Sequence, residues 1–277
     1  MMLQSGYIIR ALRRIEDSPR ASPGLAALSV AAGFSPFHFH RHFLQVMGET
    51  VGSYVRRTRL DAAAAWLGDS DESIMSIALT VGYQNHESLT RAFKRRFGLP
   101  PLQYRALARS QRGAIMLRDL ELAGQVQHRR IASQSLIGMR FFGPYARIGE
   151  FWARFVQTLL AHGIDPGDAT PVGVRRDHPG ITPAQLTRYD CCIVDSRSPA
   201  SVRPPFARYT LHNGSVATLL HDGSYDHAPP RHRVINHAWC RLHDRRIETV
   251  LSYEFYHRPP WLARHGPVSM SIMIPIH

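Results

Sequence analysis

The chain has 277 residues, of which 44% are hydrophobic and 20% charged, and this balance excludes long disorder. No apolar run approaches the roughly 20 residues that span a bilayer, and the first residues carry Arg10, Arg13 and Arg14 without the apolar core of an export signal, so we expect a cytoplasmic protein with no membrane segment. Three cysteines, two of them adjacent, exclude a disulfide framework and a CxxC metal knuckle.

The charge balance is strongly basic. Lys and Arg number 34 against 21 Asp and Glu, a formal charge of +13, which indicates a polyanionic partner such as nucleic acid. Residues 1–110 hold 14 basic and 8 acidic residues, and residues 111–277 hold 20 and 13, so both parts contribute. The densest stretch, residues 86–112, carries seven basic residues and the single acid Glu87. Taken alone, such a cluster is as typical of a solvated helix face as of a binding surface.

Residues 25–104 contain two copies of one unit. Residues 25–34 recur as 74–83 at an offset of 49, and after one extra residue 39–54 recur as 89–104 at an offset of 50. Each copy predicts a short helix with apolar residues at i, i+3 and i+7, a glycine that ends it, and a second helix. One weak copy would be more typical of an ordinary helical hairpin, but two matched copies favour two helix-turn-helix units.

Capping residues set the expected helix boundaries. The second helices should begin after Ser35 and Asn85 and end at Gly48 and Gly98. Between the two units, residues 51–67 predict one helix of about 17 residues, ~25 Å long, that holds the units at a fixed spacing.

Two recognition helices joined by a rod suit double-stranded DNA. They would enter adjacent major-groove segments on one face of the duplex, whose centres lie ~34 Å apart. Side chains at the start of each second helix would then meet base edges. Farther along the second recognition helix, we expect Lys94, Arg95 and Arg96 to lie near phosphates.

A longer pattern runs through residues 73–84, 88–98 and Pro101-x-x-Tyr104-Arg105. It resembles the DNA-binding signature of the AraC/XylS transcriptional regulators, and the likeness covers residues 5–107. The resemblance implies an all-α domain with two helix-turn-helix units. It also implies base-facing side chains at Phe37, His40 and Arg41 in the first recognition helix and at His86, Glu87 and Arg91 in the second. Of these, the arginines have an obvious preference, bidentate pairing with guanine.

Three histidines cluster on the first recognition helix, and His38 and His42 stand at i, i+4 on one face. A metal site is the alternative interpretation, but neither an HExxH glutamate nor a third ligand at a recognisable spacing accompanies them. We therefore expect no metal and no cofactor. Contact with DNA, or packing against it, explains the cluster more simply.

Residues 105–124 mix Arg, Gln, Gly and Leu without a strong period, which predicts a linker. We accordingly expect a multidomain chain. Its parts would be an all-α double helix-turn-helix DNA-binding domain at 1–108, a linker at 109–124 and an α+β domain at 125–277.

The second domain contains its own repeat, at an offset of 80. Residues 137–145 recur as 217–225, each a strand that ends in a Gly-x-Tyr turn. A helix and two further strands follow in each copy. The copies are therefore predicted as two β-α-β-β units, which a pseudo-twofold axis would relate in an α+β domain with a cleft between its halves.

One position breaks this symmetry, since Glu254 in the second copy corresponds to Val174 in the first. Strand alternation places Ser252, Glu254 and Tyr256 on one face, where a carboxylate is costly unless something meets it. One interpretation is an edge-strand gatekeeper or a salt bridge to an arginine. The other is the anionic floor of an aromatic pocket that receives a cation. The candidate walls of that pocket are Tyr256, Tyr145, Tyr225, Trp152 and Trp239.

Residues 143–145, the run from Asp177 to Asp190, and residues 254–256 resemble the GyrI-like effector-binding domain. The likeness covers residues 125–277. It implies that Glu254 lies in a ligand cavity, and many members of this group bind lipophilic cations. The second copy departs from the pattern, with Ser224 in place of proline, Pro229-Pro230 just ahead of its helix, and several histidines nearby. A pocket of different shape or charge would follow.

Together these patterns predict a sequence-specific transcription regulator, an activator rather than a repressor. It would bind DNA through its N-terminal domain and a small, lipophilic, cationic effector through its C-terminal domain, with RNA polymerase as a further candidate partner. Two alternatives stay open. The C-terminal domain acts as a small hydrolase through Glu254, or the protein binds DNA without an effector.

Overall fold

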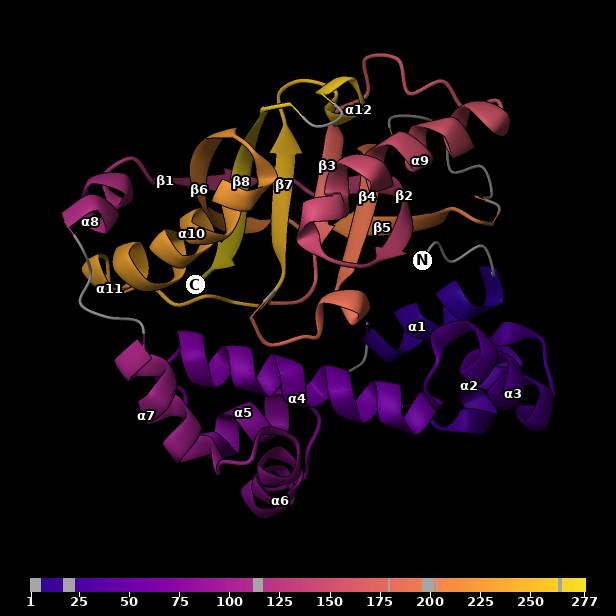
Figure 1. Cartoon of the computed structure of the whole chain (residues 1–277), viewed down its shortest axis with the longest axis horizontal. Helices are drawn as coiled ribbons and strands as arrows, with labels where there is room; N and C mark the ends of the chain where they lie inside the picture. The colour runs from indigo at the N-terminus through magenta and orange to yellow at the C-terminus, as the bar shows by residue number, and fades with distance from the viewer. Residues whose placement is uncertain are drawn as a thin grey trace. The chain divides into compact units, whose positions relative to one another are not determined.

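A computed structural model describes residues 6–16, 23–111, 117–178, 180–195, 202, 204–263 and 266–277. The chain divides into two compact units (Figure 1). The N-terminal unit spans Leu3–Gly113, and the C-terminal unit holds Ala114–His277. Each unit is described by itself.

The N-terminal unit is all-helical. Its helices are α1 (Gly6–Glu16), α2 (Leu25–Ala32), α3 (Pro36–Met47), α4 (Val51–Asp69), α5 (Ile74–Thr80), α6 (His86–Phe97) and α7 (Pro101–Gln111). The pairs α2–α3 and α5–α6 are the two predicted helix-turn-helix units, and α4 is the predicted rod between them. With 19 residues, α4 is about 28 Å long.

The recognition helices begin and end where the sequence predicts. The side chains of Ser35 and Asn85 accept hydrogen bonds from the backbone N–H groups of His38 and Ser88, at 3.4 and 2.8 Å. At the other ends, Gly48 and Gly98 adopt φ angles of +70° and +78°. Side chains rarely adopt this left-handed conformation, so glycine closes both helices cheaply.

The segment predicted as a linker, residues 105–124, contains the boundary between the two units, and its described residues are largely helical although the sequence showed no strong period. Helix α7 continues to Gln111, and α8 (Leu117–Ala123) follows. Tertiary contacts explain α7, because the Tyr104 ring packs edge-on against Phe93 at 5.2 Å and Arg105 donates a hydrogen bond to the backbone carbonyl of Glu72. Tertiary contacts of this kind stabilise a helix even where the spacing of apolar residues in the sequence predicts one only weakly.

The C-terminal unit is one curled antiparallel sheet with helices on one face. The sheet order is β1-β6-β8-β7-β3-β4-β2-β5. The strands are β1 (Gln127–Ile131), β2 (Gln134–Phe142), β3 (Pro171–Arg175), β4 (Arg188–Val194), β5 (Ala207–Leu211), β6 (Gly214–Gly223), β7 (Ser252–Tyr256) and β8 (Val268–Ile276). The helices are α9 (Ile148–Ala161), α10 (Ala228–Arg233), the π-helix η4 (Val234–Trp239), α11 (Cys240–Leu242) and α12 (Pro260–Ala263), with short 3-10 turns η1 (Tyr145–Arg147), η2 (Ala184–Leu186) and η3 (Tyr225–His227).

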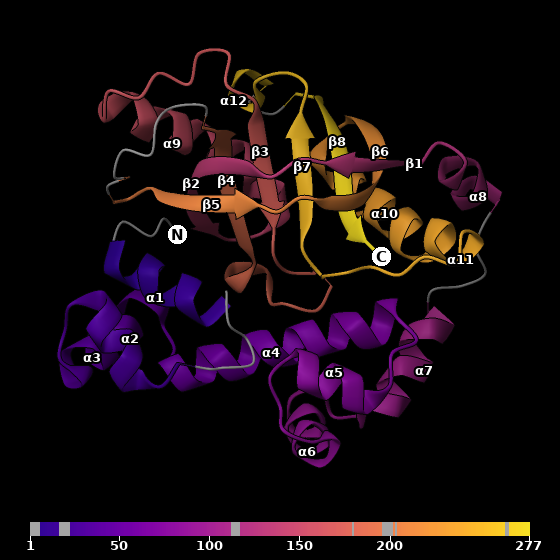
Figure 2. The ribbon, with the colours of Figure 1, turned by 180° about the vertical axis from the view of Figure 1, so that it is seen from behind.

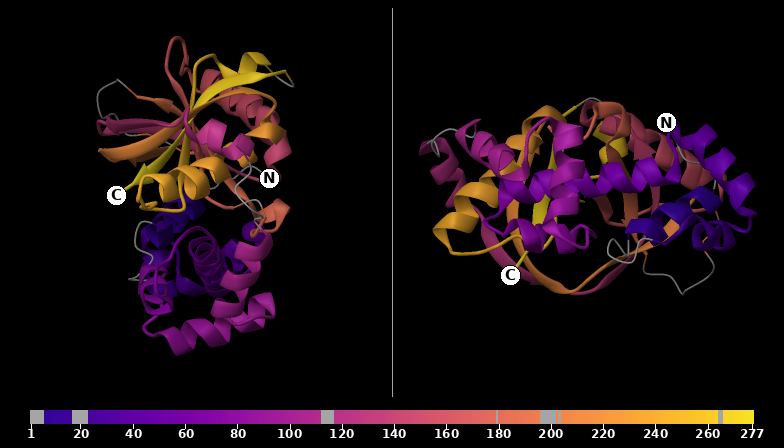
Figure 3. Two further views of the ribbon diagram at one scale, coloured as in Figure 1. Left: turned by 90° about the vertical axis from the view of Figure 1, so that its left-hand side faces the viewer. Right: turned by 90° about the horizontal axis from the view of Figure 1, so that it is seen from below.

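The two predicted repeats are present, and each carries one more strand than expected. The first repeat is β1-β2-α9-β3-β4 and the second is β5-β6-α10-β7-β8. The extra strands are exchanged, since β1 pairs with β6 of the second repeat and β5 pairs with β2 of the first. Seen from behind in Figure 2, β1 and β5 run across the sheet on the side away from α9 and α10, and Figure 3 shows the curl from two further sides.

The strand register corrects one predicted correspondence. The β2–β4 pair of the first repeat corresponds to the β6–β8 pair of the second, and β3–β4 corresponds to β7–β8. When these pairs are aligned, each residue of β3 corresponds to the residue of β7 that follows 81 positions later in the chain. Glu254 is therefore equivalent to Gly173, its direct partner across β3 and β7, and the predicted equivalence with Val174 is wrong by one residue. The second copy has gained one residue between the start of its helix, which keeps the offset of 80, and β7.

The helix of the second repeat also begins earlier than predicted. Pro229 and Pro230 lie inside its first turn and not ahead of it, because α10 starts at Ala228. Proline is tolerated there, since the first N–H groups of a helix have no partner within it.

Candidate DNA interface and candidate effector site

Each recognition helix in the N-terminal unit has one buried face and one exposed face. Phe39 and Phe43 of α3 are fully buried, as are Leu89 and Phe93 of α6. These residues anchor the helices, and Arg41 and Arg91, at the middle of the interval between the anchors, face outward. The predicted base-facing side chains on α3 are Phe37, which is 72% exposed, Arg41, which is exposed, and His40, which is half-buried; on α6 they are His86, Glu87 and Arg91, all exposed.

Farther along α6 the predicted phosphate contacts divide. Lys94 and Arg95 are exposed. Arg96 instead turns back to α4, where its Nε donates to Asp61 Oδ1 at 2.9 Å. This ion pair makes Arg96 a link between α6 and α4, so the expectation that it lies near phosphates is not supported.

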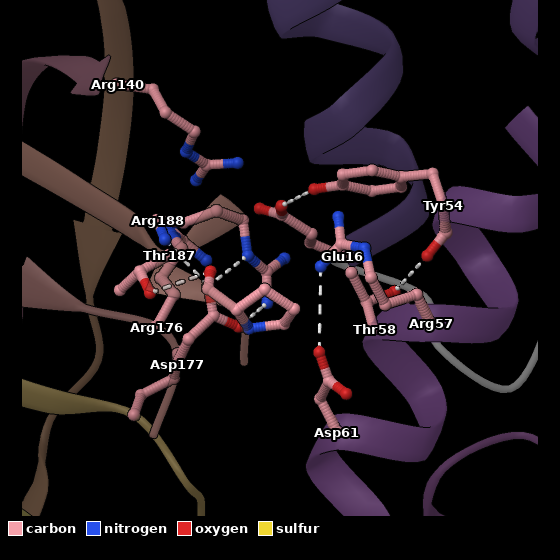
Figure 4. A network of polar contacts seen from close by, with 12 residues as sticks. Glu16, Tyr54, Arg57, Thr58, Asp61, Arg140, Arg176, Asp177, Thr187 and Arg188 are labelled. Carbon is pink, nitrogen blue, oxygen red and sulfur yellow. Dashed lines mark hydrogen bonds and ion pairs between the residues drawn. The ribbon is translucent and has the colours of Figure 1, made fainter. Parts of the chain in front are cut away.

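Asp61 belongs to a buried polar network that fixes α4 (Figure 4). Its side chain is 4% exposed and lies 3.6 Å from Arg57 Nη1, while Arg57 Nη2 donates to Glu49 at 2.6 Å. At the start of α4, Tyr54 donates to Glu16 of α1 at 3.0 Å. These contacts tie α4 to α1, to the turn that follows α3 and to α6.

The histidine cluster on α3 separates into different environments. His42 contacts the Tyr7 hydroxyl, and its ring lies 5.1 Å from that of Tyr7, so it packs within the unit. His38 is exposed. Among the described residues, no three His, Cys, Asp or Glu side chains are grouped so that they could hold a metal ion.

In the C-terminal unit, Glu254 lies at the centre of the helix-covered face and has no exposed surface. Three phenols converge on its carboxylate. Tyr189 donates to Oε2 at 2.7 Å, Tyr256 donates to Oε2 at 3.1 Å, and Tyr145 donates to Oε1. The carboxylate is therefore met by hydroxyl donors and not by an arginine, which answers the predicted alternative of a salt bridge.

An aromatic layer surrounds this carboxylate. The ring centroids of Tyr145 and Tyr225 lie 6.2 Å apart, and those of Trp152 and Tyr256 lie 5.2 Å apart. Four of the five predicted walls are thus brought together. Trp239 is not among them, since its ring contacts His243 at 4.8 Å at the far end of η4. Tyr145 is half-buried and marks where the layer reaches the surface.

Burial controls the ionisation of this cluster. Burial raises the pKa of Glu254. The hydrogen bonds from the tyrosines and the positive charge of Arg175 lower this pKa and so offset part of the rise. Burial, with the nearby carboxylate, also raises the pKa values of Tyr145, Tyr189 and Tyr256. The phenols therefore keep their protons and serve as donors.

Sequence reasoning did not place Tyr189 or Arg175 near Glu254, and it predicted His232 only as one of several histidines that would change the shape or charge of the pocket. Gly173 is the direct partner of Glu254 across β3 and β7. Because Gly173 has no side chain, the Tyr189 hydroxyl can reach Glu254 through the space beside it. Arg175 donates from Nε to Ser252 Oγ at 3.0 Å, and His232 Nε2 lies 3.8 Å from Glu254 Oε1. Arg175 and Tyr189 are direct partners across β3 and β4, so their side chains lie on one face of the sheet. The pairing of β3 with β7 then places Glu254 on the same face, and neither pairing follows from the sequence alone.

The buried arginines on other parts of the sheet have carboxylate partners. Arg140 donates to Asp190 from Nε at 2.6 Å and from Nη2 at 2.9 Å. Arg188 donates to both oxygens of Asp177, at 2.8 and 2.6 Å (Figure 4). These bidentate pairs are structural, because each buried charge is balanced within the sheet.

The sequence matches two protein families. Residues 28–107 match "Helix-turn-helix domain", and residues 125–277 match "GyrI-like small molecule binding domain". No helix in the described part of the chain is long and apolar enough to cross a membrane.

Several known proteins are similar to this chain. "Multiple antibiotic resistance protein MarA" of Escherichia coli (strain K12) is 34% identical over 91 residues, which make up 33% of this chain and 72% of MarA. "Probable transcription factor PqrA" of Proteus vulgaris is 35% identical over 96 residues, which make up 34% of this chain and 79% of PqrA. The solved DNA-binding domain of AdpA in complex with a target DNA aligns with 40% of this chain and 98% of that domain, at 24% identity and a TM-score of 0.37.

Proposed function

The chain belongs to the AraC/XylS-type transcription regulators that carry a C-terminal GyrI-like small-molecule-binding domain, and from this premise we propose that it is an effector-responsive activator. Residues 1–108 would read DNA, and residues 125–277 would bind the effector. The observation that carries the proposal is the pairing of two features in one chain. These are two recognition helices with exposed polar faces and a buried carboxylate within an aromatic layer.

For DNA, the proposal assigns direct readout to the first two turns of α3 and α6. Arg41 and Arg91 would pair with guanines, and His40, His86 and Glu87 would contact other base edges. Lys94 and Arg95 would neutralise phosphates. Because the network around Asp61 fixes the rod, the two half-sites would have one preferred separation.

For the effector, the proposal assigns a positively charged group to Glu254. A ligand would reach this buried carboxylate if Tyr145, the half-buried member of the layer, moved aside. The cation would then replace the Tyr145 hydroxyl as a partner of Oε1, while the rings of Tyr225, Tyr256 and Trp152 supply cation–π contacts. The Trp152 indole N–H, which is buried and has no hydrogen-bond partner among the described residues, offers the ligand one further donor.

Regulation would follow from differential affinity. An effector that prefers one arrangement of the chain shifts its population, and couplings of this kind are typically about 1–3 kcal/mol, or roughly 5–150-fold in affinity. The same shift, acting on contact with RNA polymerase, would produce activation.

The first test is DNA affinity of the full-length protein. Binding to its own upstream intergenic DNA should exceed binding to an unrelated fragment of equal length by ~10³-fold at physiological salt. The double variant Arg41→Ala/Arg91→Ala should fall toward the non-specific level, while the exposed control Arg154→Ala on α9 should not. Equal affinity for both fragments would refute the assignment.

The second test concerns Glu254. An aromatic cation, methyl 4-(aminomethyl)benzoate, should quench or shift tryptophan fluorescence on binding, and Glu254→Gln should weaken that binding by about tenfold or more. Turnover of this ester to the free acid, abolished in Glu254→Gln, would instead favour the hydrolase alternative. Specific DNA binding without any response to ligands would favour a regulator that needs no effector.

A further inference from the structure

Arg175 is a buried arginine that forms no ion pair with a carboxylate in the described part of the chain. It is 5% exposed, and its guanidinium makes one hydrogen bond, from Nε to Ser252 Oγ. The other two buried arginines of the sheet, Arg140 and Arg188, each hold a carboxylate in two hydrogen bonds. Within the described residues, the Nη groups of Arg175 therefore have donors to spare.

The position of Arg175 places it in the Glu254 site. Arg175 pairs with Ser252 across β3 and β7, and Glu254 lies two residues farther along β7 on the same face. Diagonal neighbours of this kind have their Cα atoms ~7–8 Å apart. The charge of Arg175 also lowers the pKa values of Glu254 and His232, as expected for groups that share one buried environment.

His232 defines the other side of the site. Its Nδ1 lies 3.0 Å from the backbone carbonyl of Ala228, which only accepts, so Nδ1 carries the proton. Burial, with Arg175 second, lowers the pKa of His232 well below its usual value, so the ring is neutral and Nε2 is an acceptor. Nε2 has no hydrogen-bond partner among the described residues and faces Glu254 Oε1 at 3.8 Å. Two acceptors this close call for a donor between them.

The site thus offers two binding features of opposite kind. His232 Nε2, beside the Glu254 carboxylate, is an acceptor without a donor among the described residues, and Arg175 has Nη donors without an acceptor there. A buried charge without a partner is unfavourable, so an anion placed against Arg175 would gain more here than it would at an exposed arginine.

We propose that the effector is amphoteric, with a protonated nitrogen that donates to Glu254 and His232 and an anionic oxygen group, such as a carboxylate, that accepts from Arg175. This rests on the proposed function, because it concerns the same site. It excludes simple quaternary cations as the best ligands, since these have no N–H to donate and would be repelled by Arg175.

Three matched probes test the inference with the full-length protein. They are 4-(aminomethyl)benzoate, which carries both charges, its methyl ester, which keeps the cation, and its N-acetyl derivative, which keeps the anion. Wild-type protein should bind the amphoteric probe at least about tenfold more tightly than either derivative. In Arg175→Met the preference over the ester should vanish, while the exposed control Arg154→Met should retain it.

Thermal unfolding without ligand gives an independent readout. If Arg175 is kept for the ligand, Arg175→Met should unfold close to the wild-type temperature, because within the described residues its guanidinium makes one hydrogen bond and no ion pair. Arg140→Met should lower the unfolding temperature or fail to fold, because it leaves Asp190 with one cation fewer.

The outcomes separate this inference from the proposed function. The inference is overturned if the ester binds wild-type protein as tightly as the amphoteric probe, or if Arg175→Met loses as much thermal stability as Arg140→Met. If the ester binds and Glu254→Gln abolishes its binding, the proposed function stands although the inference fails. If no probe binds wild-type protein that still binds DNA, the effector site itself is refuted.

Discussion

Gly173 is the position where a single methyl group should do most damage to the effector site. A Cβ atom at Gly173 would lie 2.6 Å from Cζ of Tyr189 and closer still to its hydroxyl, and 3.2 Å from Glu254 Oε2. Because the Tyr189 ring is rigid and fully enclosed, it would have to leave the carboxylate. Gly173→Ala therefore both overpacks the core and removes the hydrogen bond from Tyr189 to Glu254.

The two effects set the magnitude. Overpacking costs about 1–3 kcal/mol, and a lost hydrogen bond to a charged group costs about 1.5–3 kcal/mol. Together these give a loss of about 2.5–6 kcal/mol in the free energy of unfolding, which should lower the unfolding temperature by roughly 5–24 °C. Calorimetry and denaturant titration followed by tryptophan fluorescence would measure both quantities.

A matched glycine provides the control. Gly214 begins β6 in the same sheet, and a Cβ there would meet nothing within 4 Å, so Gly214→Ala should change stability by less than about 0.5 kcal/mol. The double variant Gly173→Ala/Tyr189→Phe should cost less than the two single variants together, because both remove the same hydrogen bond. The reasoning is refuted if Gly173→Ala is as stable as Gly214→Ala, or if the double variant is additive.

Further expectations concern both units. Arg91→Ala should weaken binding to the upstream DNA by about 1–3 kcal/mol and relax the base preference at one position. Arg95→Ala should instead weaken binding to all sequences alike and reduce the slope of log affinity against log salt concentration by about 0.9. Titrations at several salt concentrations distinguish these results. Asp61→Ala should destabilise the N-terminal unit by about 3 kcal/mol, because it leaves buried positive charge behind, while Asp71→Ala, whose side chain is 88% exposed, should cost less than about 1 kcal/mol in the same denaturant titration; equal losses would contradict the argument. Burial raises the pKa of Glu254 above its ordinary 4.5, so folding favours the protonated form and the wild-type protein loses stability as pH rises above that value. Glu254→Gln should therefore gain stability relative to wild type as pH rises above about 4.5, and a difference that is constant with pH would count against it.

The N-terminal unit was predictable in detail because its signals are local. Helix ends depend on neighbouring residues, such as Ser35 at a start and Gly48 at an end, and these can be read without knowing the fold. The repetition of the unit at a nearly constant offset then identified the pair. The full length of helix α7 was not predicted, because contacts with α4 and α6 stabilise it and the spacing of its own apolar residues shows no strong helical pattern.

The effector site was predictable only in part because it is built from strand pairing. Glu254 stood out as a carboxylate in an apolar strand, and the Gly-x-Tyr turns pointed to Tyr145 and Tyr225. Its immediate partners Tyr189 and Arg175 depend on which strands are neighbours and on a register that one inserted residue changes. Trp239 was predicted as a pocket wall because it lies on the helix of the second repeat. In the structure it ends the π-helix η4, and its ring packs against His243 and not beside Glu254.

The exchanged edge strands also dictate an order of events during synthesis. Since β1 closes on β6 and β5 closes on β2, neither repeat can complete its sheet before residues of the other have left the ribosome. Pairings this distant along the chain slow folding, whereas the helices of the N-terminal unit meet mostly near neighbours in sequence. The recognition helices are therefore in place while the environment of Glu254 is still being assembled, and a nascent or interrupted chain would be able to hold DNA before it is able to respond to an effector.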